Sequence, residues 1–555
     1  MSITRITIEN FKGVGERVEV DLKPITILFG ANSAGKSTIL QAMLYLRELL
    51  ERRNADADRL LTSGTSIDLG GFRQFVHCHD LNREVKIGVT VEVGGDGLPV
   101  LPVVEWGRDE DEVLRSFSEN GTTEVRTVRV EVGVGWNAET SSPQIRSYSV
   151  YLDEDRFATM KAESEHQCYL VECIADHPTF VGEFLTSPEQ DYYPAECEYL
   201  QGYIDSKNLG LEEDRLKGVY RVPVQSKSVV PDWNNLILPQ PPFFNKPEPE
   251  DDGFEEFQQY RYSQLVLSQL LVGSGRTVLD ELQKIRYVGP LRTLPERNFS
   301  ALRSPSEERW ADGIAAWDRL YQSASSPDGN GLINEVSTFL SEEKRLNMGY
   351  SLSPSHVYEI DRDGFALAAL KLLAEGAEDV EVEERIKVIL KDILESPEKV
   401  SVQLKDLENQ SLVAPNDIGV GVSQVVPVIV AALTPGASAT AIEQPELHLH
   451  PAIQARMGDL FIESALKEGV ENRFILESHS EHLILRLLRR IRECHEEGVD
   501  YPDHLPKIKP EDLSVYYIQS EEGHTSMTNL RVSDDGDFLD RWPNGFFDER
   551  AGELF

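Results

Sequence analysis

Ile25-Thr-Ile-Leu-Phe-Gly30-Ala-Asn-Ser-Ala-Gly35-Lys-Ser-Thr38 is the stretch from which the fold can be inferred. The apolar run from Ile25 to Phe29 has the composition of a buried strand, and Ser37 to Arg52 carries the apolar period of a helix. Between them lies the pattern Gly-x4-Gly-Lys-Ser. In such a loop, backbone N–H groups at a helix N-terminus surround a phosphate group. The stretch therefore predicts a site for a nucleoside triphosphate, held together with Mg²⁺.

The positions of this loop have separate chemical tasks. Lys36 is expected to reach the β- and γ-phosphates, and the Ser37 hydroxyl is expected to bind Mg²⁺. The predicted nucleotide-binding residues are Gly30, Asn32, Ser33, Ala34, Gly35, Lys36, Ser37 and Thr38.

Composition limits the classes of protein to which this chain can belong. With 555 residues, 40% of them hydrophobic, the chain can form roughly two to four compact units. No uninterrupted apolar run reaches the roughly 18 residues of a membrane helix, and the N-terminus lacks the layout of a signal peptide. The 5 cysteines are scattered without a Cys-x-x-Cys pair, which indicates neither disulfides nor a zinc site. These features predict a cytoplasmic protein with no membrane partner.

The net charge of −40 disfavours nucleic acid as a general partner, because an acidic surface repels phosphates. Nucleic acid binding would need a local basic patch, and the chain has two candidates. For the first, a solvated helix surface is the favoured interpretation, and a patch that binds nucleic acid or a partner is the alternative. The candidates are Arg486, Arg489, Arg490 and Arg492 on one predicted helix, and Lys284, Arg286, Arg292, Arg297 and Arg303 further upstream.

Three further motifs lie far downstream of the phosphate loop. The segment Asp417-Ile-Gly-Val-Gly-Val-Ser-Gln424 opens an apolar helix, whose positive N-terminus would offer a second phosphate-binding surface. Ala439 to Glu443 reads as a strand, followed by a helix that begins at Pro451. Phe474-Ile-Leu-Glu-Ser-His479 places polar residues at another strand end. Polar groups at the ends of parallel strands are where ligands bind.

In this order the motifs resemble the ABC-type ATPase heads of the SMC, RecF and OLD group. Leu69-Gly-Gly-Phe, Tyr287-Val-Gly-Pro-Leu-Arg292 and Trp542-Pro-Asn-Gly-Phe-Phe-Asp548 are similar to a prokaryotic subgroup of these AAA-family ATPases with a C-terminal domain of unassigned function. The resemblance implies an α/β fold, an ABC-type P-loop NTPase head. Its mixed sheet would be flanked by helices and joined by an antiparallel β-subdomain, a large insertion and a helical lobe. Relatives serve in DNA repair and in anti-phage defence, such as the Septu and PARIS ATPases, often beside a separate effector protein.

The resemblance also implies residue roles. Glu443 takes the metal-facing Walker B position, His479 is the switch histidine that senses the γ-phosphate, and Gln74 is a candidate metal-sensing glutamine. The implied catalytic residues are Glu443, Gln444 and His479, and the implied metal ligands are Ser37, Glu443 and Gln74. The residues expected to reach the γ-phosphate held by a second subunit are Gly419, Gly421, Ser423 and Gln424.

Gln444 departs from the pattern of the family, which usually has a glutamate here to polarise the attacking water. An amide can orient water but cannot accept its proton. Two expectations stay open: hydrolysis is slow, or Glu446 or His479 supplies the base.

The chain is expected to divide into five segments. They are an N-terminal part of the ATPase head with the antiparallel β-subdomain (1–155), an insertion of unknown role (156–282), a helical lobe with a hairpin (283–416), the C-terminal part of the head (417–500) and a family-specific tail (501–555).

The leading hypothesis is an ATP-hydrolysing homodimer that acts as a nucleotide-gated switch in anti-phage defence or DNA-damage processing and controls a separate effector. A slow or non-hydrolysing scaffold, favoured by Gln444, is the first alternative. A transporter subunit is the second, disfavoured by the long separation of Gly30 from Gly419. Two weaker interpretations concern metals: His448 and His450 with His479 or His482, and Asp534-Asp-Gly-Asp537, for which a β-turn is the favoured alternative.

Overall fold

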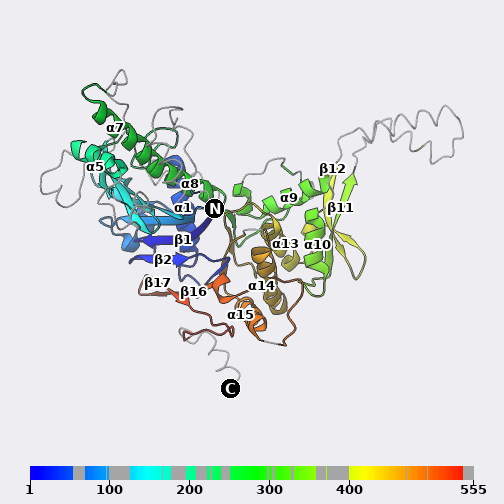
Figure 1. The fold of residues 1–555 in the computed structure, drawn as a ribbon. Coiled ribbons are helices and arrows are strands. Elements are labelled where there is room, and N and C mark those ends of the chain that lie inside the picture. The colour runs from blue at the N-terminus through cyan, green and yellow to red at the C-terminus, as the bar shows by residue number, and fades with distance from the viewer. Residues whose placement is uncertain are drawn as a thin grey trace, which may run out of the picture.

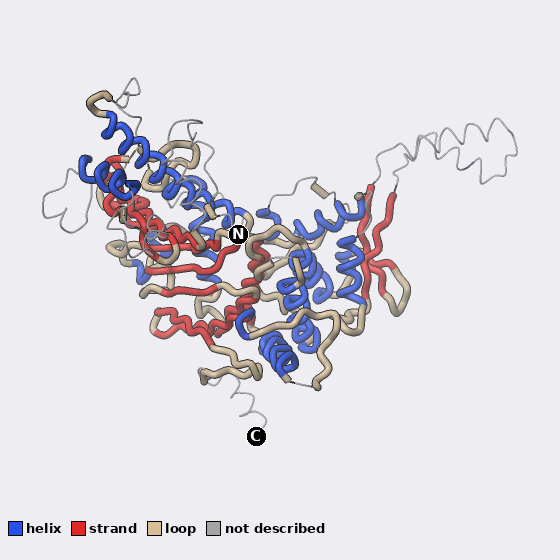
Figure 2. The backbone as a smooth tube through the Cα atoms, viewed as in Figure 1, coloured by secondary structure: helices blue, strands red, loops and turns tan. Residues whose placement is uncertain are grey.

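A central sheet with a lobe on either side forms the body of the chain (Figures 1 and 2). In one lobe an antiparallel sheet packs with helices, and in the other helices predominate. None of the helices in the described part of the chain is long and apolar enough to cross a membrane. This computed structural model describes residues 1–53, 69–94, 97–98, 125–164, 167–175, 177, 195–207, 222–224, 228–238, 250–296, 299, 301–302, 307–326, 331–357, 371, 399–469, 472–496 and 498–541.

The central sheet has six strands, and all neighbours are parallel except the last pair. In spatial order they are β10 (Arg286–Val288), β14 (Thr440–Glu443), β15 (Phe474–Ser478), β3 (Ile25–Gly30), β16 (Leu513–Glu521) and β17 (His524–Leu530). The strands predicted before the phosphate loop and before the two downstream motifs are therefore confirmed. Within the predicted tail, 501–555, β16 pairs directly with β3 and so belongs to the central sheet.

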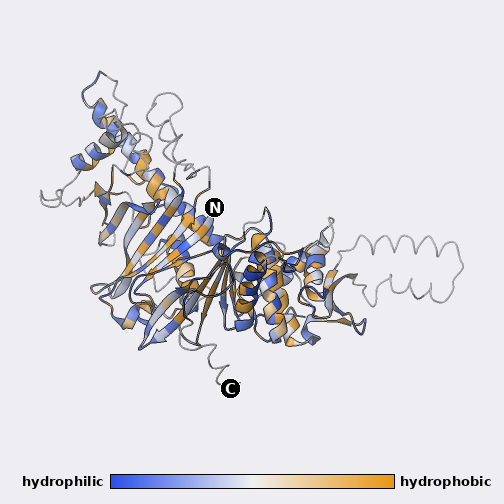
Figure 3. Cartoon of the chain, turned by 60° about the horizontal axis from the view of Figure 1, so that its bottom comes forward, coloured by the Kyte–Doolittle hydropathy of each residue, from blue (hydrophilic) through white to orange (hydrophobic). Residues whose placement is uncertain are grey.

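This sheet separates two hydrophobic cores. Successive side chains of a strand point to opposite faces, and β3 follows that alternation. Ile25, Ile27 and Phe29 belong to the core on the helical side, whereas Leu28 belongs to the core shared with the β-subdomain. Apolar residues concentrate where the helices pack beside the sheet (Figure 3). The all-apolar composition of β3 thus reflects burial on both faces.

The first lobe contains an eight-stranded antiparallel sheet. In spatial order its strands are β2 (Val18–Asp21), β1 (Ser2–Glu9), β4 (Val85–Glu92), β5 (Thr127–Asn137), β6 (Ser142–Leu152), β7 (Asp155–Ser164), β8 (Gln167–Cys173) and β9 (Val222–Pro223). β1 and β2 form an antiparallel pair at the start of the segment for which an antiparallel β-subdomain was expected. The sheet runs across the boundary expected at residue 156, since β7 forms a hairpin with β6.

Helices of this lobe pack along the antiparallel sheet and include the one that follows the phosphate loop. They are α1 (Ser37–Arg52), α5 (Ala195–Lys207), α7 (Phe254–Leu267), the π-helical turn η5 (Ser268–Val272) and α8 (Gly273–Gln283). Two short elements, α2 (Phe72–Phe75) and η2 (His77–His79), precede β4.

The described helices of the second lobe lie on the other side of the central sheet, where α13 and α14 contact its strands, together with a small antiparallel sheet. They are α9 (Ile314–Ser325), α10 (Gly331–Ser341), α13 (Val420–Leu433), α14 (Pro451–Leu466) and α15 (Glu481–His495), with β11 (Tyr350–Val357), β12 (Lys399–Asp406), β13 (Leu412–Val413) and the short turns η6 (Glu307–Trp310), η7 (Pro415–Asp417) and η8 (Pro510–Asp512).

The segment 283–416, for which a helical lobe with a hairpin was expected, contains the helices α9 and α10 and the antiparallel pair β12 and β13. Residues 358–370 and 372–398 of this segment lie outside the described residues. The tail motif that begins at Trp542 lies outside them as well.

Candidate nucleotide site

The phosphate loop connects β3 to α1 at the carboxyl edge of the central sheet. Glycine is required at Gly30 because a Cβ there would lie 2.0 Å from the Ile518 carbonyl oxygen of the neighbouring strand. Gly35 has φ +100°, a backbone conformation that favours glycine. The Lys36 ammonium is buried and donates to the carbonyl oxygens of Gly30 at 3.2 Å and Ala31 at 2.8 Å. The Lys36 ammonium is thus held inside the loop by carbonyl oxygens of the loop itself, at the start of α1.

Three glutamates gather beside this loop, of which Glu446 and Glu477 are buried and Glu443 is half-buried. Glu443 ends β14 and is in register with Glu477 on β15, while Glu446 follows β14. Burial raises the pKa of Glu477 to about 7, and repulsion from Glu443 and Glu446 contributes. Burial also raises the pKa of Glu443 and of Glu446, whereas it lowers the pKa of Lys36. The nearby positive charges therefore do not fully offset the cost of burying the negative charges of these three carboxylates.

The oxygen atoms of this cluster fit a magnesium ion. The Ser37 hydroxyl donates to Glu477 Oε2 at 2.7 Å, which places the expected metal-binding hydroxyl next to a carboxylate. Hydroxyl and carboxylate oxygens are the hard donors that Mg²⁺ prefers. Ser37, Glu443 and Glu477 would hold the ion, which would neutralise phosphate charge there. Glu477 had no assigned role from sequence, although an acid at the end of a parallel strand was the signal used for Glu443.

A buried arginine connects the end of β14 with α13, the helix that begins in the segment Gly419 to Gln424, which we call the signature segment. Arg292 donates to the carbonyl oxygen of Glu443 at 2.6 Å and to that of Gln444 at 3.2 Å. Burial lowers its pKa to about 10, an effect that the nearby carboxylates partly offset. The amide of Gln424 donates to the Arg292 carbonyl at 2.7 Å, and Tyr287 donates to Glu443 Oε1 at 2.7 Å. The predicted motif from Tyr287 to Arg292 therefore contacts both the end of β14 and Gln424 of α13.

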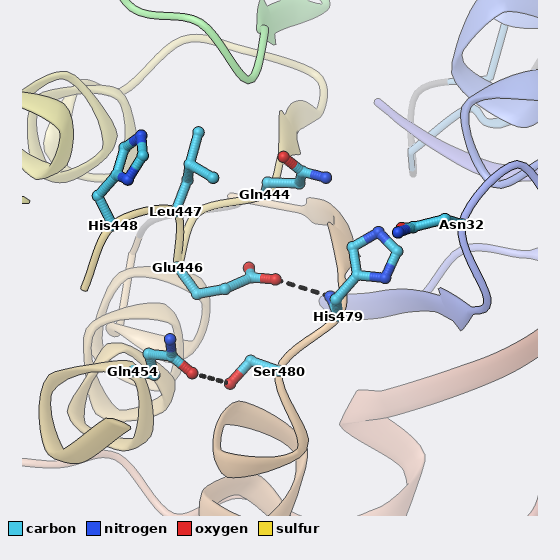
Figure 4. Close-up of a pocket in the computed structure, with 8 residues that line it drawn as sticks. All are labelled: Asn32, Gln444, Glu446, Leu447, His448, Gln454, His479 and Ser480. Atoms are coloured by element: carbon cyan, nitrogen blue, oxygen red, sulfur yellow. Dashed lines mark hydrogen bonds between the residues drawn. The ribbon is translucent and has the colours of Figure 1, made fainter. Parts of the chain in front are cut away.

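A pocket of about 410 Å³ opens in front of these groups (Figure 4). The backbone N–H of His479 donates to Glu446 Oε1 at 2.7 Å, and the imidazole lies between Glu446 and Asn32. Burial, and then the charge of Lys36, lowers the pKa of His479. The structure thus brings Asn32 of the predicted loop and the predicted catalytic residues Gln444 and His479 to one pocket, which is lined by Asn32, Gln444, Glu446, Leu447, His448, Gln454, His479 and Ser480.

Unlike the phosphate loop, the signature segment, Gly419 to Gln424, begins at an exposed helix end. Gly419 is the N-cap of α13 and makes no side-chain cap, and Val420 is 57% exposed. Ser423 is buried, and its hydroxyl donates to the Val420 carbonyl at 2.9 Å. The exposed end consists of Gly419 and Val420, whereas Gly421 is half-buried and the side chains of Ser423 and Gln424 are engaged within the chain. Their contact with a second subunit stays a prediction.

Gln74 lies on the short helix α2 with an exposed side chain, and the described contacts do not join it to Ser37 or Glu443. Lys12 approaches the site instead. Its backbone N–H donates to Phe75 at 2.6 Å, its ammonium donates to Gln41, and it interacts electrostatically with Glu443. Nothing in the sequence distinguished this lysine, because its proximity to Glu443 depends on how the lobes pack.

The arginines of α15 are paired with acids of the same chain. Arg490 lies 2.8 Å from Asp459 and 2.6 Å from Glu493, and Arg486 and Arg489 pair with the same two acids. Arg492 pairs with Asp537 at 2.7 Å. In the upstream cluster, Lys284 pairs with Glu281, and Arg286 and Arg292 are buried, while Arg297 and Arg303 lie outside the described residues. The described members of both clusters therefore form internal contacts, which argues against these two nucleic acid patches.

The two weaker metal interpretations find no support within the described ranges. His450 caps α14 by accepting from the Ala452 N–H at 3.3 Å, and His448 lines the pocket. The histidines at 448, 450, 479 and 482 do not come together as a ligand group in those ranges. Asp534 to Asp537 form a turn in which the Gly536 N–H donates to Ser533, as the favoured alternative predicted.

The family matches cover both parts of the nucleotide site. β15, which ends just before His479, lies between β3, which leads into the phosphate loop, and β14, which ends at Glu443. Residues 1–122 match the family described as AAA ATPase domain, and residues 295–486 match the AAA domain family described as putative AbiEii toxin, Type IV TA system. Residues 508–555 match a family described as a protein of unknown function (DUF3696). The two longer matched segments, 1–122 and 295–486, therefore belong to AAA domain families.

Solved structures with a similar arrangement include SMC heads. The SMC head domain from Thermotoga maritima is 8% identical, with 96% of this chain and 100% of that chain covered and a TM-score of 0.34. The Smc head of Pyrococcus furiosus, bound to the C-terminal domain of ScpA, is 13% identical, with 96% of both chains covered and a TM-score of 0.36. These are distant likenesses, and the assignment of the two matched segments rests on the family matches alone. A comparison with curated proteins finds no match.

The raised pKa of Glu477 predicts a pH-dependent stability. The folded-state pKa of about 7 exceeds the ordinary 4.5, so the folded chain keeps a proton that the unfolded chain releases between these values. Stability is therefore lost as pH rises through about 7. Glu477→Gln removes this loss, which is worth about 1.4 kcal/mol per pKa unit and on the order of 3 kcal/mol in all. In nucleotide-free buffer, the variant's gain in Tm over wild type should be larger at pH 8 than at pH 5.

Glu468→Gln, the same change at an exposed position, is the matched control and should give equal Tm differences at both pH values. Equal differences for Glu477→Gln would show that Glu477 does not titrate in this range.

Proposed function

We propose that two copies of the chain enclose two ATP molecules and act as a nucleotide-gated switch on a separate effector protein, in anti-phage defence or DNA-damage processing. The loop from Gly30 to Thr38 binds the phosphates, and Ser37, Glu443 and Glu477 hold Mg²⁺. His479 senses the γ-phosphate from the pocket that it shares with Gln444. Hydrolysis then reopens the pair.

The exposed N-terminus of α13 is the observation that carries this proposal. A helix N-terminus with free N–H groups attracts phosphate, and this one has no side-chain cap. It lies in the helical lobe, whereas α1 and the phosphate loop lead into the other lobe (Figure 1). Isologous pairing of two copies would complete both sites at once. The description of the family matched by residues 295–486, a putative AbiEii toxin, supports a role beside an effector.

The direct test is the mass of the full chain in solution, measured by analytical ultracentrifugation with and without ATP and Mg²⁺. ATP should shift the sedimentation profile toward a dimer, or should close an existing dimer into a more compact one. Lys36→Ala should not respond. An ATP-bound protein that stays monomeric and keeps full hydrolysis would contradict the proposal.

Complementation tests whether the sites are shared between subunits. A Cβ at Gly419 meets no atom within 4 Å, so Gly419→Asp fits the fold and even provides a preferred N-cap. Its charge should nevertheless repel a phosphate and abolish hydrolysis. Mixing Gly419→Asp with Lys36→Ala should restore about a quarter of wild-type activity, because half of the randomly formed dimers contain one intact site.

Gly419→Asn is the matched control, since it caps the helix equally well without the charge. It should keep most of the activity. No recovery on mixing two folded variants that still pair would place each complete site within one subunit.

A second candidate function is a scaffold that binds ATP and hydrolyses it slowly or not at all. Gln444 favours it, because its amide lies in the pocket where a base would be expected. Steady-state phosphate release from wild type distinguishes the two functions.

A further inference from the structure

A cluster of metal-binding side chains lies where η2 meets the β16–β17 turn. His77 and Cys78 belong to η2, and His524 begins β17. One ligand atom from each of the three lies within 4.8 Å of the others, and it is the single group of this kind in the described part of the chain. Neither the phosphate loop nor the pocket of Figure 4 uses these side chains.

His77 has the surroundings of a metal-binding histidine. Its side chain is 1% exposed, and its Nδ1 lies 2.9 Å from the Lys12 carbonyl oxygen. A carbonyl only accepts, so Nδ1 carries the proton and Nε2 keeps a free lone pair. Nε2 is buried and has no hydrogen-bond partner among the described residues. An imidazole oriented by a backbone carbonyl through its other nitrogen is the usual support of a metal ligand.

The chain also leaves room at this nitrogen. A Cβ at Gly15 would lie 2.7 Å from His77 Nε2, so glycine keeps the adjoining space open. The ring of His524 lies 4.9 Å from that of His77, centre to centre. Cys78 and His524 are both exposed, which gives an ion a path from solvent and lets their side chains move.

We propose that His77, Cys78 and His524 bind a divalent transition-metal ion of the Zn²⁺ class. Two imidazole nitrogens and one thiolate are the donors this ion selects, whereas Mg²⁺ and Ca²⁺ require oxygen. Tetrahedral bonds of about 2.1 and 2.3 Å would draw the ligand atoms roughly 1 Å closer together. Three protein ligands leave a fourth position for water.

The ion would join two segments that are far apart in the sequence and adjacent to the phosphate loop. Thr525 follows His524, and its N–H donates to Gly13 at 2.7 Å. Its hydroxyl donates to the Ala34 carbonyl of the loop at 3.2 Å. Bound metal would therefore restrain the β16–β17 turn against the loop that holds phosphate. This structural role does not depend on dimer formation or on an effector.

Cobalt titration of the chelator-stripped full chain tests the site, because a cobalt–thiolate bond produces a charge-transfer absorption band. Wild type should bind one Co²⁺ with this band, and Zn²⁺ should displace it. Cys78→Ser should lose the band, and His524→Ala should weaken binding by about 100-fold or more. Gly15→Ala should also weaken binding by crowding Nε2. The matched control is His79→Ala, since His79 Nδ1 contacts the Arg73 carbonyl.

A measurement on wild type alone complements the variants. Zn²⁺ should protect Cys78 from alkylation, as read by mass mapping of the modified peptides. The proposal is overturned if no thiolate band forms, if Cys78 is alkylated equally with and without Zn²⁺, or if His79→Ala loses binding as His524→Ala does.

Discussion

Lys36→Ala should weaken ATP binding by about 100-fold to 10,000-fold. Hydrogen bonds from a charged donor contribute about 1.5–3 kcal/mol each, and the ammonium is expected to make two of them to the β- and γ-phosphates. A factor of ten corresponds to about 1.4 kcal/mol. Isothermal titration calorimetry with ATP and Mg²⁺ measures this loss directly.

The variant should remain folded, although the carbonyl oxygens of Gly30 and Ala31 lose the donor that they have in the structure. A Tm close to that of wild type confirms this. Lys344→Ala, a change at an exposed lysine, is the control and should bind ATP normally. Near-native affinity of Lys36→Ala would show that the loop does not hold the phosphates as proposed.

Gln444→Glu should raise ATP hydrolysis by about 100-fold to 10,000-fold, the usual contribution of a well-placed general base. Gln444 has φ 45°, and glutamate has the same shape as glutamine, so the exchange changes the chemistry without changing the backbone requirement. The side chain already lines the pocket with His479 and Asn32. Wild-type turnover should accordingly lie below the ~1–100 s⁻¹ of enzymes with a complete base.

Glu446 is the competing base, because it lines the same pocket and burial raises its pKa. Glu446→Gln preserves an acceptor for the His479 N–H while removing the base. If Glu446 is the base, this variant should lose most of the turnover, and Gln444→Glu should slow the enzyme by adding charge beside the γ-phosphate. Phosphate release by Gln444→Glu, Glu446→Gln and wild type under saturating ATP separates the two accounts. A slower Gln444→Glu that still binds ATP would contradict the first.

Local pattern alone was sufficient for the elements that carry the nucleotide site. The apolar run at Ile25 and the helical period from Ser37 correspond to β3 and α1, and the strands before Glu443 and His479 were recognised in the same way. Alternation, helix starts and glycine requirements depend on a few neighbouring residues, so they can be read without knowing what packs against them. Their spatial grouping followed from the rule that parallel strands end at one edge.

Contacts between distant segments were decided by the tertiary structure. The last strands of the chain complete the sheet beside β3, the Ser37 hydroxyl meets Glu477, and Asp459 and Glu493 pair with arginines that looked free. His77 comes near His524 only because η2 and the β16–β17 turn lie side by side. The sequence by itself therefore determined which residues form the phosphate loop and the strand ends. Only folding decided which charges are neutralised and which ligands meet, because such pairing depends on the packing of whole lobes and not on neighbours in the chain.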